Sequence, residues 1–185
     1  MAAPRIYVCF LWHMHQPFYK DLVSGEYRLP WTRMHALKDY WGMVKILGEF
    51  PAIHQTFNLV PSMVAQIEEY ASGQASDPFL RLALKPAEDL TPSERAFVLK
   101  YFFQANVERM IQRYPRYAEL HERREAGVRD WTAAELRDLQ VLSQLAWFDE
   151  YDHVNDALIR ALAKKAHGFN REDQALLGET QIEVL

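Results

Sequence analysis

Hydrophobic residues fill the chain from Ile6 to Trp12 without a polar interruption, and most of them are β-branched or aromatic. Such a run predicts a strand that is buried on both faces, as in a parallel sheet. Pro17, which lacks an amide hydrogen, ends the strand. Cys9 lies inside this run and is predicted to be a small core residue rather than a nucleophile. Residues 52–59 predict a second strand.

A loop and a helix are predicted between the two strands. Residues 18–31 are polar and aromatic and include Gly25 and Pro30, which is typical of a loop. Apolar residues then recur at helical spacing over residues 36–48, which predicts an amphipathic helix. The order strand, loop, helix and strand is a βαβ unit, so the two strands should be parallel. A further helix is predicted from Pro61.

From about residue 78 the pattern predicts helices only. Thr91 and Thr132 each begin a capping box, because a glutamate follows three residues later. Asn170 is expected to cap a last helix. The predicted helices run from about 91 to 113, from 115 to 126, from 132 onward, from 153 to 166, and from 170 onward. We therefore divide the chain into two βα units over residues 1–75 and a helical region over residues 76–185.

Two strands of the buried type cannot form a stable sheet by themselves, because their faces and edges would remain open. The sequence therefore predicts an α/β fold that is the N-terminal part of a larger parallel barrel. The remaining barrel strands are expected to lie beyond Leu185.

Two imidazoles mark the end of the first predicted strand. Side chains alternate across a strand, so His13 and His15 should point the same way, and Gln16 should converge with them. Ligands bind at the carboxyl ends of strands in parallel α/β folds. Asn58, at the end of the second strand, should lie beside this pair. Trp31, in the predicted loop, is a candidate to line the same cleft, as is Arg33.

Three interpretations of the histidine pair remain open. A His-x-His pair can hold a metal ion through its neutral imidazole nitrogens. It can also hydrogen-bond a polyhydroxylated substrate, or it can be satisfied by backbone carbonyls and have no further role. The acidic cluster Asp149, Glu150 and Asp152 is expected to be structural, because it lies between helices next to a Trp-Phe pair.

Composition narrows the class of protein. The chain has 185 residues, of which 49% are hydrophobic and 25% are charged, as in an ordinary globular protein. The net charge of −4, with no block of basic residues, gives no support for a nucleic-acid or membrane partner. A single cysteine excludes an internal disulfide framework, so the predicted location is cytoplasmic. No apolar run approaches the roughly 20 residues that a membrane span needs.

Three segments resemble the family-57 glycoside hydrolases. Residues 12–18 read WHMHQPF, which is similar to the first conserved region of that family, centred on His-Gln-Pro. Residues 29–40 (LPWTRMHALKDY) and 56–62 (TFNLVPS) continue the resemblance in the same order. Residues 145–149 (LAWFD) lie in a helical part that is similar to the long insertion of the larger members.

The resemblance implies an incomplete (β/α)7 barrel that acts on α-glucans such as starch, glycogen or maltooligosaccharides. It implies a retaining hydrolase or transglycosylase that uses a Glu nucleophile and an Asp general acid/base, and no metal or other cofactor. In such chemistry the two carboxyls flank the scissile bond about 5 Å apart. Neither family motif for these carboxylates occurs in this sequence, so no catalytic residue is assigned, and the chain alone is expected to be inactive.

The resemblance carries over one residue directly, His15, as a sugar-binding residue near the scissile bond. His13, Trp31 and Asn58 are further predicted substrate-binding residues. Two alternatives remain beside this hypothesis: a metal-dependent hydrolase that uses His13 and His15 as ligands, and a non-catalytic carbohydrate-binding or helical module.

Overall fold

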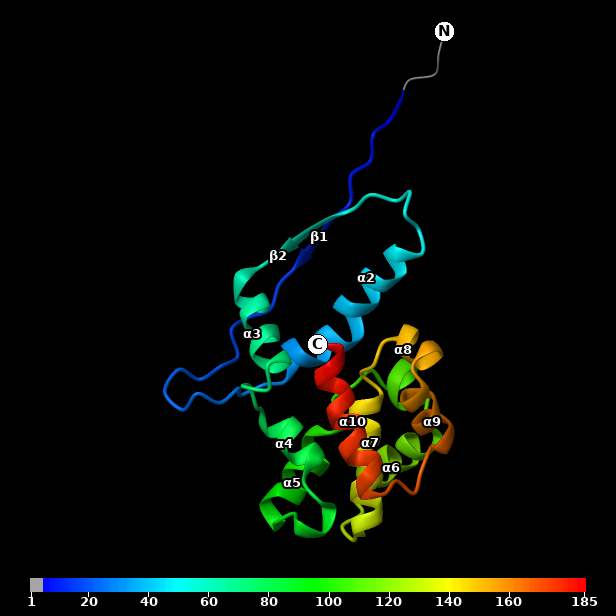
Figure 1. Ribbon diagram of the computed structural model, residues 1–185. Coiled ribbons are helices and arrows are strands. Elements are labelled where there is room, and N and C mark those ends of the chain that lie inside the picture. The colour runs from blue at the N-terminus through cyan, green and yellow to red at the C-terminus, as the bar shows by residue number, and fades with distance from the viewer. Residues whose placement is uncertain (1–4) are drawn as a thin grey trace.

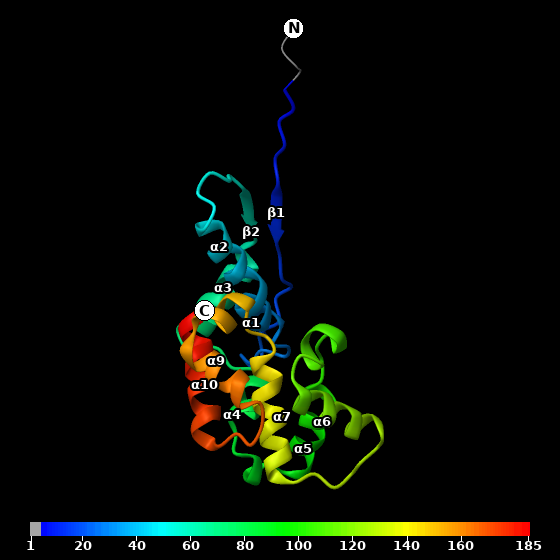
Figure 2. The ribbon, with the colours of Figure 1, turned by 90° about the vertical axis from the view of Figure 1, so that its right-hand side faces the viewer.

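A computed structural model describes residues 5–185 of the chain. It shows a pair of short strands with helices beside them at one end and a larger helical body at the other (Figure 1). The view at 90° shows the same division, with the strands again at the end away from the helical body (Figure 2). Among the described residues, no helix is long and apolar enough to cross a membrane.

The sheet consists of β1 (Leu11–Met14) and β2 (Thr56–Leu59), which pair in parallel. The parallel pairing predicted from the βαβ order is therefore confirmed. The sheet of the described residues has two strands, and the rest of a barrel is not present in it. The predicted second strand is shorter than expected, because pairing begins at Thr56 and not at residue 52.

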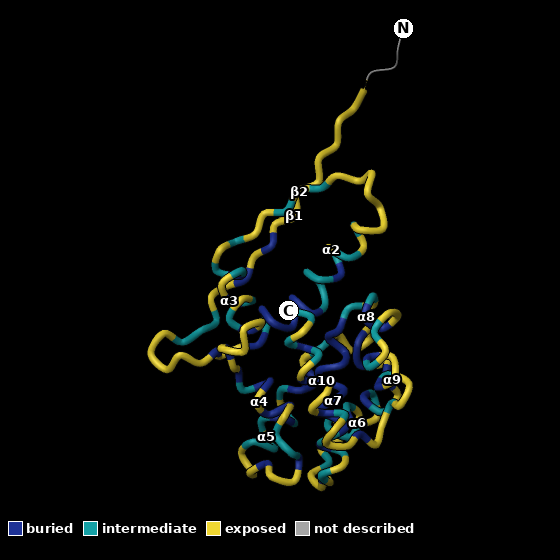
Figure 3. The backbone as a smooth tube through the Cα atoms, in the orientation of Figure 1, coloured by how far each residue is buried: buried dark blue, intermediate teal, exposed yellow. Residues whose placement is uncertain are grey.

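The prediction of a first strand buried on both faces is wrong for this structure. Pairing starts only at Leu11, and the residues before it extend away from the body; Ile6 is 87% exposed. Cys9 is exposed as well, so it is not a core residue here. Figure 3 shows the exposed N-terminal stretch leading into β1. The physical reason is the sheet itself, since two strands leave both edges and most of both faces without neighbours.

The first helix is longer than predicted and contains a change of winding. It consists of α1 (Trp31–His35), the π-helical turn η1 (Ala36–Tyr40) and α2 (Trp41–Gly48). Trp31 is therefore a helical residue and does not belong to the predicted loop. Arg33, which we expected to line a cleft, is fully buried and paired with Asp77. π-turns of this kind occur frequently at functional sites.

The helix predicted from Pro61 is α3 (Pro61–Ala71), with Pro61 in its first turn as expected. Met63 and Tyr70 are its buried apolar side chains. The loop before α1 is closed by an antiparallel bridge between Lys20 and Tyr27. Together these elements form the two strand-helix units that the sequence predicts in the N-terminal part.

The helical body contains one helix that the sequence analysis did not predict, α4, which Asp77 caps through its side chain. The capping boxes at Thr91 and Thr132 and the cap at Asn170 are confirmed. The elements of the body, in chain order, are α4 (Pro78–Leu84), η2 (Ala87–Asp89), α5 (Pro92–Tyr101), η3 (Val107–Ile111), α6 (Pro115–Glu125), α7 (Ala133–Leu145), α8 (Glu150–Asn155), α9 (Ala157–Lys165) and α10 (Arg171–Val184).

Two predicted helices are broken where a polar side chain starts a new turn. The helix expected from 91 to 113 ends at Tyr101, and Asn106 then caps η3 by accepting a hydrogen bond from the Arg109 amide. The helix expected over 153–166 is two helices, because Asp156 caps α9. Side-chain caps of this kind compete with helix continuation, which the apolar spacing does not reveal.

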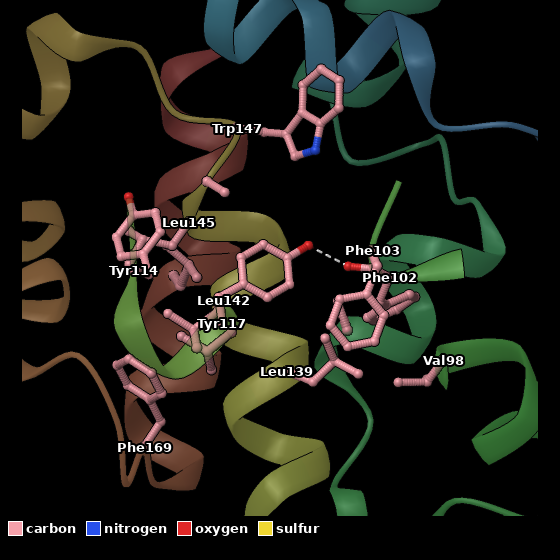
Figure 4. Packing of buried hydrophobic residues seen from close by; sticks show 14 of the residues in the cluster. Val98, Phe102, Phe103, Tyr114, Tyr117, Leu139, Leu142, Leu145, Trp147 and Phe169 are labelled. Atoms are coloured by element: carbon pink, nitrogen blue, oxygen red, sulfur yellow. Dashed lines mark hydrogen bonds between the residues drawn. The ribbon is translucent and has the colours of Figure 1, made fainter. Parts of the chain in front are cut away.

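The core lies around α7. Four of its leucines, Leu136, Leu139, Leu142 and Leu145, are fully buried, and each contributes about 1.5–3 kcal/mol through burial of apolar surface. Figure 4 shows aromatic rings from a neighbouring helix and from turns packed around Leu139, Leu142 and Leu145, with the Tyr117 hydroxyl donating a hydrogen bond to the Phe102 carbonyl. This core belongs to the helical body, and the strand pair that carries the histidines described next contributes no residue to it.

Candidate functional site

His13 and His15 lie side by side at the end of β1. Their ring centroids are 5.8 Å apart and their planes differ by 14°, so both imidazoles project to the same side, as predicted. Both residues are exposed. The strand register places Asn58 of β2 directly opposite His13. The structure therefore places three of the four predicted binding residues together, His13 and Asn58 on the paired strands and His15 directly after β1.

Gln16 does not converge with the imidazoles, contrary to the sequence-based expectation. It is buried, and its amide nitrogen donates a hydrogen bond to the Tyr40 hydroxyl over 2.7 Å. Its amide oxygen accepts one from the Tyr19 hydroxyl at 3.0 Å. Burial raises the pKa of both tyrosines, which therefore stay protonated at neutral pH. Gln16 thus ties the end of β1 to the π-turn.

Trp31 lies apart from the strand pair, on the side of α1 that faces the helical body. Its ring packs against Phe79 at 6.4 Å and Trp147 at 5.9 Å, measured between ring centroids. It lines a groove of about 480 Å³ together with Tyr19 and His35. Trp31 therefore lines a groove, but His13, His15 and Asn58 are not among the residues that line it, and its role in substrate binding stays a prediction. The Tyr19 hydroxyl at this groove is hydrogen-bonded to Gln16.

Sequence reasoning missed the pair His35 and Asp39 on the π-turn. The His35 Nδ1 atom lies 2.6 Å from an Asp39 carboxylate oxygen, and Lys38 donates to the other oxygen over 2.6 Å. Burial acts to raise the pKa of Asp39, but the hydrogen bonds from His35 and Lys38 outweigh it and lower that pKa. A histidine directly before the predicted helix over residues 36–48 and an aspartate four residues later were the available signal.

The acidic cluster has the structural roles that the sequence analysis expected. Asp149 caps α8 by accepting a hydrogen bond from the Tyr151 amide at 2.7 Å. Glu150 forms an ion pair with Arg113 over 2.7 Å. Asp152 accepts a hydrogen bond from the Trp41 indole at 3.1 Å, and burial raises its pKa.

The histidine pair has no third metal ligand beside it among the described residues. Among residues 5–185, no group of three or more histidine, cysteine, aspartate or glutamate side chains is arranged to hold a metal ion. Structural and catalytic zinc sites use three or four protein ligands. His13 and His15 can instead donate or accept hydrogen bonds through their ring nitrogens.

The imidazoles lie at the carboxyl end of a parallel strand, which is where α/β folds place their ligand sites. The model of glycosyl hydrolase family 57 matches residues 9–167. The chain therefore belongs to this family, as its resemblance in three segments indicated, and carries a glycoside hydrolase domain. No curated protein and no solved structure matches the chain significantly.

Proposed function

We propose that this chain is part of a retaining glycoside hydrolase or transglycosylase whose substrates are α-glucans. The observation that carries the proposal is the joint position of His13 on β1, His15 directly after β1, and Asn58 on β2 in a family-57 chain. All three side chains are exposed and can meet the hydroxyl groups of a sugar. Hydrogen bonds of this kind orient a glycosyl ring for attack.

His15 is the residue that contacts the sugar nearest the scissile bond in this proposal, and His13 and Asn58 hold the same or the adjoining sugar. Gln16 is a positioning residue, because its hydrogen bonds to Tyr19 and Tyr40 fix the backbone that carries His15. Trp31 is a further substrate-binding residue in this proposal, in the groove that it lines with Tyr19 and His35.

The nucleophile and the general acid/base belong, in the same proposal, to later barrel strands outside these 185 residues. Two observations support this part. Asp149, Glu150 and Asp152 are engaged in helix capping, an ion pair and an indole hydrogen bond. In addition, β1 and β2 expose apolar side chains, including Leu11 and Leu59, that further strands of a barrel would cover.

The domain division follows from the same reasoning. Residues 1–75 are proposed to be the first two βα units of the barrel, and residues 76–185 the helical insertion; residues 1–4 lie outside the described part. Both strands of the described chain occur in the first region, and the second consists of helices and connecting turns.

The test uses the 185-residue chain and the longer protein that includes the later strands. We expect the chain to bind maltoheptaose in titration calorimetry without hydrolysing it. The longer protein should hydrolyse maltoheptaose, and NMR of the first product should show the α-anomer. Hydrolysis by the chain alone would place the carboxylates within it, and a β-anomeric first product would overturn the retaining mechanism. Binding of cellohexaose in place of maltoheptaose would overturn the α-glucan assignment.

A further inference from the structure

The groove that contains Trp31 is open to solvent, and its volume lies in the range of ligand sites. Its volume is about 480 Å³, and Tyr19, Trp31, His35, Gln104, Ala105 and Trp147 line it. Small-molecule sites typically occupy about 300–1,000 Å³ and combine apolar or aromatic walls with a few polar groups. The groove lies between the N-terminal part and the helical body, because Tyr19, Trp31 and His35 belong to the former and the other three to the latter.

The two indole rings form the apolar wall of the groove. The planes of Trp31 and Trp147 are inclined by 47°, and the His35 ring meets Trp147 edge-on at a centroid distance of 5.4 Å. Trp147 is only 9% exposed, so the core fixes its orientation. Large rigid aromatic surfaces of this kind are suited to pack against the C–H face of a pyranose ring.

The polar groups of the groove are available for hydroxyl groups. Asp39 engages Nδ1 of His35, which leaves Nε2 for a ligand. Gln104 is exposed, and its side-chain amide has no hydrogen-bond partner among residues 5–185. An imidazole nitrogen and an amide together offer both donors and acceptors, as vicinal sugar hydroxyls require.

The groove and the histidine pair are separate places on the chain. His13 and His15 do not line the groove; Tyr19, one of its lining residues, donates a hydrogen bond over 3.0 Å to Gln16, whose buried side chain does not converge with the imidazoles. We infer that this groove is a second glucosyl-binding subsite, formed mainly by Trp31, Trp147 and His35. The inference rests on the proposed function and extends it by naming a further place at which an α-glucan binds.

A larger groove of about 690 Å³ between α2 and α8 is a weaker candidate for the same role. Its charged side chains are largely paired with each other: Lys38 with Asp39 at 2.6 Å, and Arg113 with Glu150 at 2.7 Å. The smaller groove presents two indoles and unpaired polar groups, so the observations favour it.

The experiment measures the dissociation constant of maltoheptaose for the chain by titration calorimetry, with cellohexaose as a second probe. The variants are Trp147→Phe and Gln104→Ala, and Trp131→Phe is the matched control, because Trp131 is also 9% exposed but lies outside the groove. Loss of an aromatic surface or of one hydrogen bond should weaken binding about threefold to tenfold. The control should bind as the wild type does. Gln104 is exposed, so its variant tests the subsite even if Trp147→Phe does not fold.

The outcomes distinguish failure of the subsite from failure of the proposed α-glucan function. Weaker maltoheptaose binding in both groove variants, with an unchanged control, supports the subsite. If His15→Ala weakens binding but the groove variants do not, the subsite is wrong and the α-glucan assignment stands. If the chain binds cellohexaose instead and the groove variants weaken that binding, the subsite stands and the α-glucan assignment is wrong. Absence of binding to both probes overturns the subsite.

Discussion

Arg33 and Asp77 form an ion pair whose two side chains are fully buried, with 3.2 Å between the Arg33 Nε atom and an Asp77 oxygen. The guanidinium also donates to Gln144 over 3.1 Å and to Gln181. Tyr70 donates its hydroxyl proton to the same Asp77 oxygen at 2.8 Å. This cluster joins α1 and α3 to α7 and α10, so it connects the N-terminal part to the helical body.

Replacing Arg33 by methionine should destabilise the chain strongly. The variant leaves the Asp77 carboxylate buried without its cation, and breaking a buried pair costs about 3–5 kcal/mol. Urea denaturation followed by circular dichroism measures the loss. Arg113→Met is the control, because Arg113 pairs with the exposed Glu150. Its replacement should lower the free energy of unfolding by less than about 1 kcal/mol. Equal losses in the two variants would show that the buried pair does not join the two parts.

The same ion pair shows where sequence reasoning reached its limit. The residues that contact Arg33 lie 44, 111 and 148 positions away along the chain. No local pattern predicts such contacts, so an arginine in an aromatic segment was interpreted as a cleft residue. Features that depend on nearby residues or on chain order were predicted correctly. The capping boxes of Thr91 and Thr132 depend on residues close in sequence, and the parallel strand pairing depends on the order of the elements.

For the candidate site, alternation along β1 was sufficient to predict that His13 and His15 share a side. The same alternation puts Gln16 with Met14 on the opposite side, where both are buried, so the expectation that Gln16 converges with the imidazoles is wrong. The groove beside Trp31 could not be predicted, since its wall requires Trp147 from a distant part of the chain. The assignment of His13, His15, Trp31 and Asn58 as sugar-binding residues stays a prediction. The next experiment tests it for His15.

His15→Ala should reduce activity far more than stability. His15 is exposed, and substitutions at exposed positions usually change the free energy of unfolding by no more than about 0.5 kcal/mol. Loss of a hydrogen bond to the reacting sugar should lower kcat/KM for maltoheptaose about tenfold or more in the longer, active protein. Lys164→Ala, a change at an exposed residue of α9, is the control for surface substitution. A large drop in Tm with full activity of the folded fraction would make His15 structural.

The buried His153 should make the chain less stable in mild acid. Its Nδ1–H donates to the Asp149 carbonyl at 2.9 Å, and its Nε2 accepts from the Tyr114 hydroxyl at 2.6 Å, so the neutral ring is satisfied. Burial lowers the pKa of His153 below its usual 6.5. Below pH 6.5 the unfolded chain therefore takes up a proton that the folded chain does not, and stability falls as the pH falls toward the folded pKa.

The slope of this effect approaches about 1.4 kcal/mol per pH unit for one proton. Urea titrations of the wild type and of His153→Gln measure this pH dependence of stability. They are done at about pH 6.5, the ordinary histidine pKa, and about one pH unit above and below it. The variant should lose the part of the pH dependence that His153 contributes. Identical pH profiles for the two proteins would show that His153 does not cause the acid sensitivity.

Gly42→Ala should disturb the contact between α2 and α8. A β-carbon at Gly42 would overlap the Asp149 carboxylate, which caps α8 through the Tyr151 amide. The carboxylate must then shift and the cap weakens, so we expect a loss of about 1–3 kcal/mol in the free energy of unfolding. Gly48, at the end of the same helix, is the matched control, because no atom lies within 4 Å of its β-carbon position. Gly48→Ala should stabilise the chain by about 0.5–1 kcal/mol through the lower entropy of the unfolded state. If both alanine variants are equally stable, α2 and α8 do not approach each other as closely as Gly42 and Asp149 indicate.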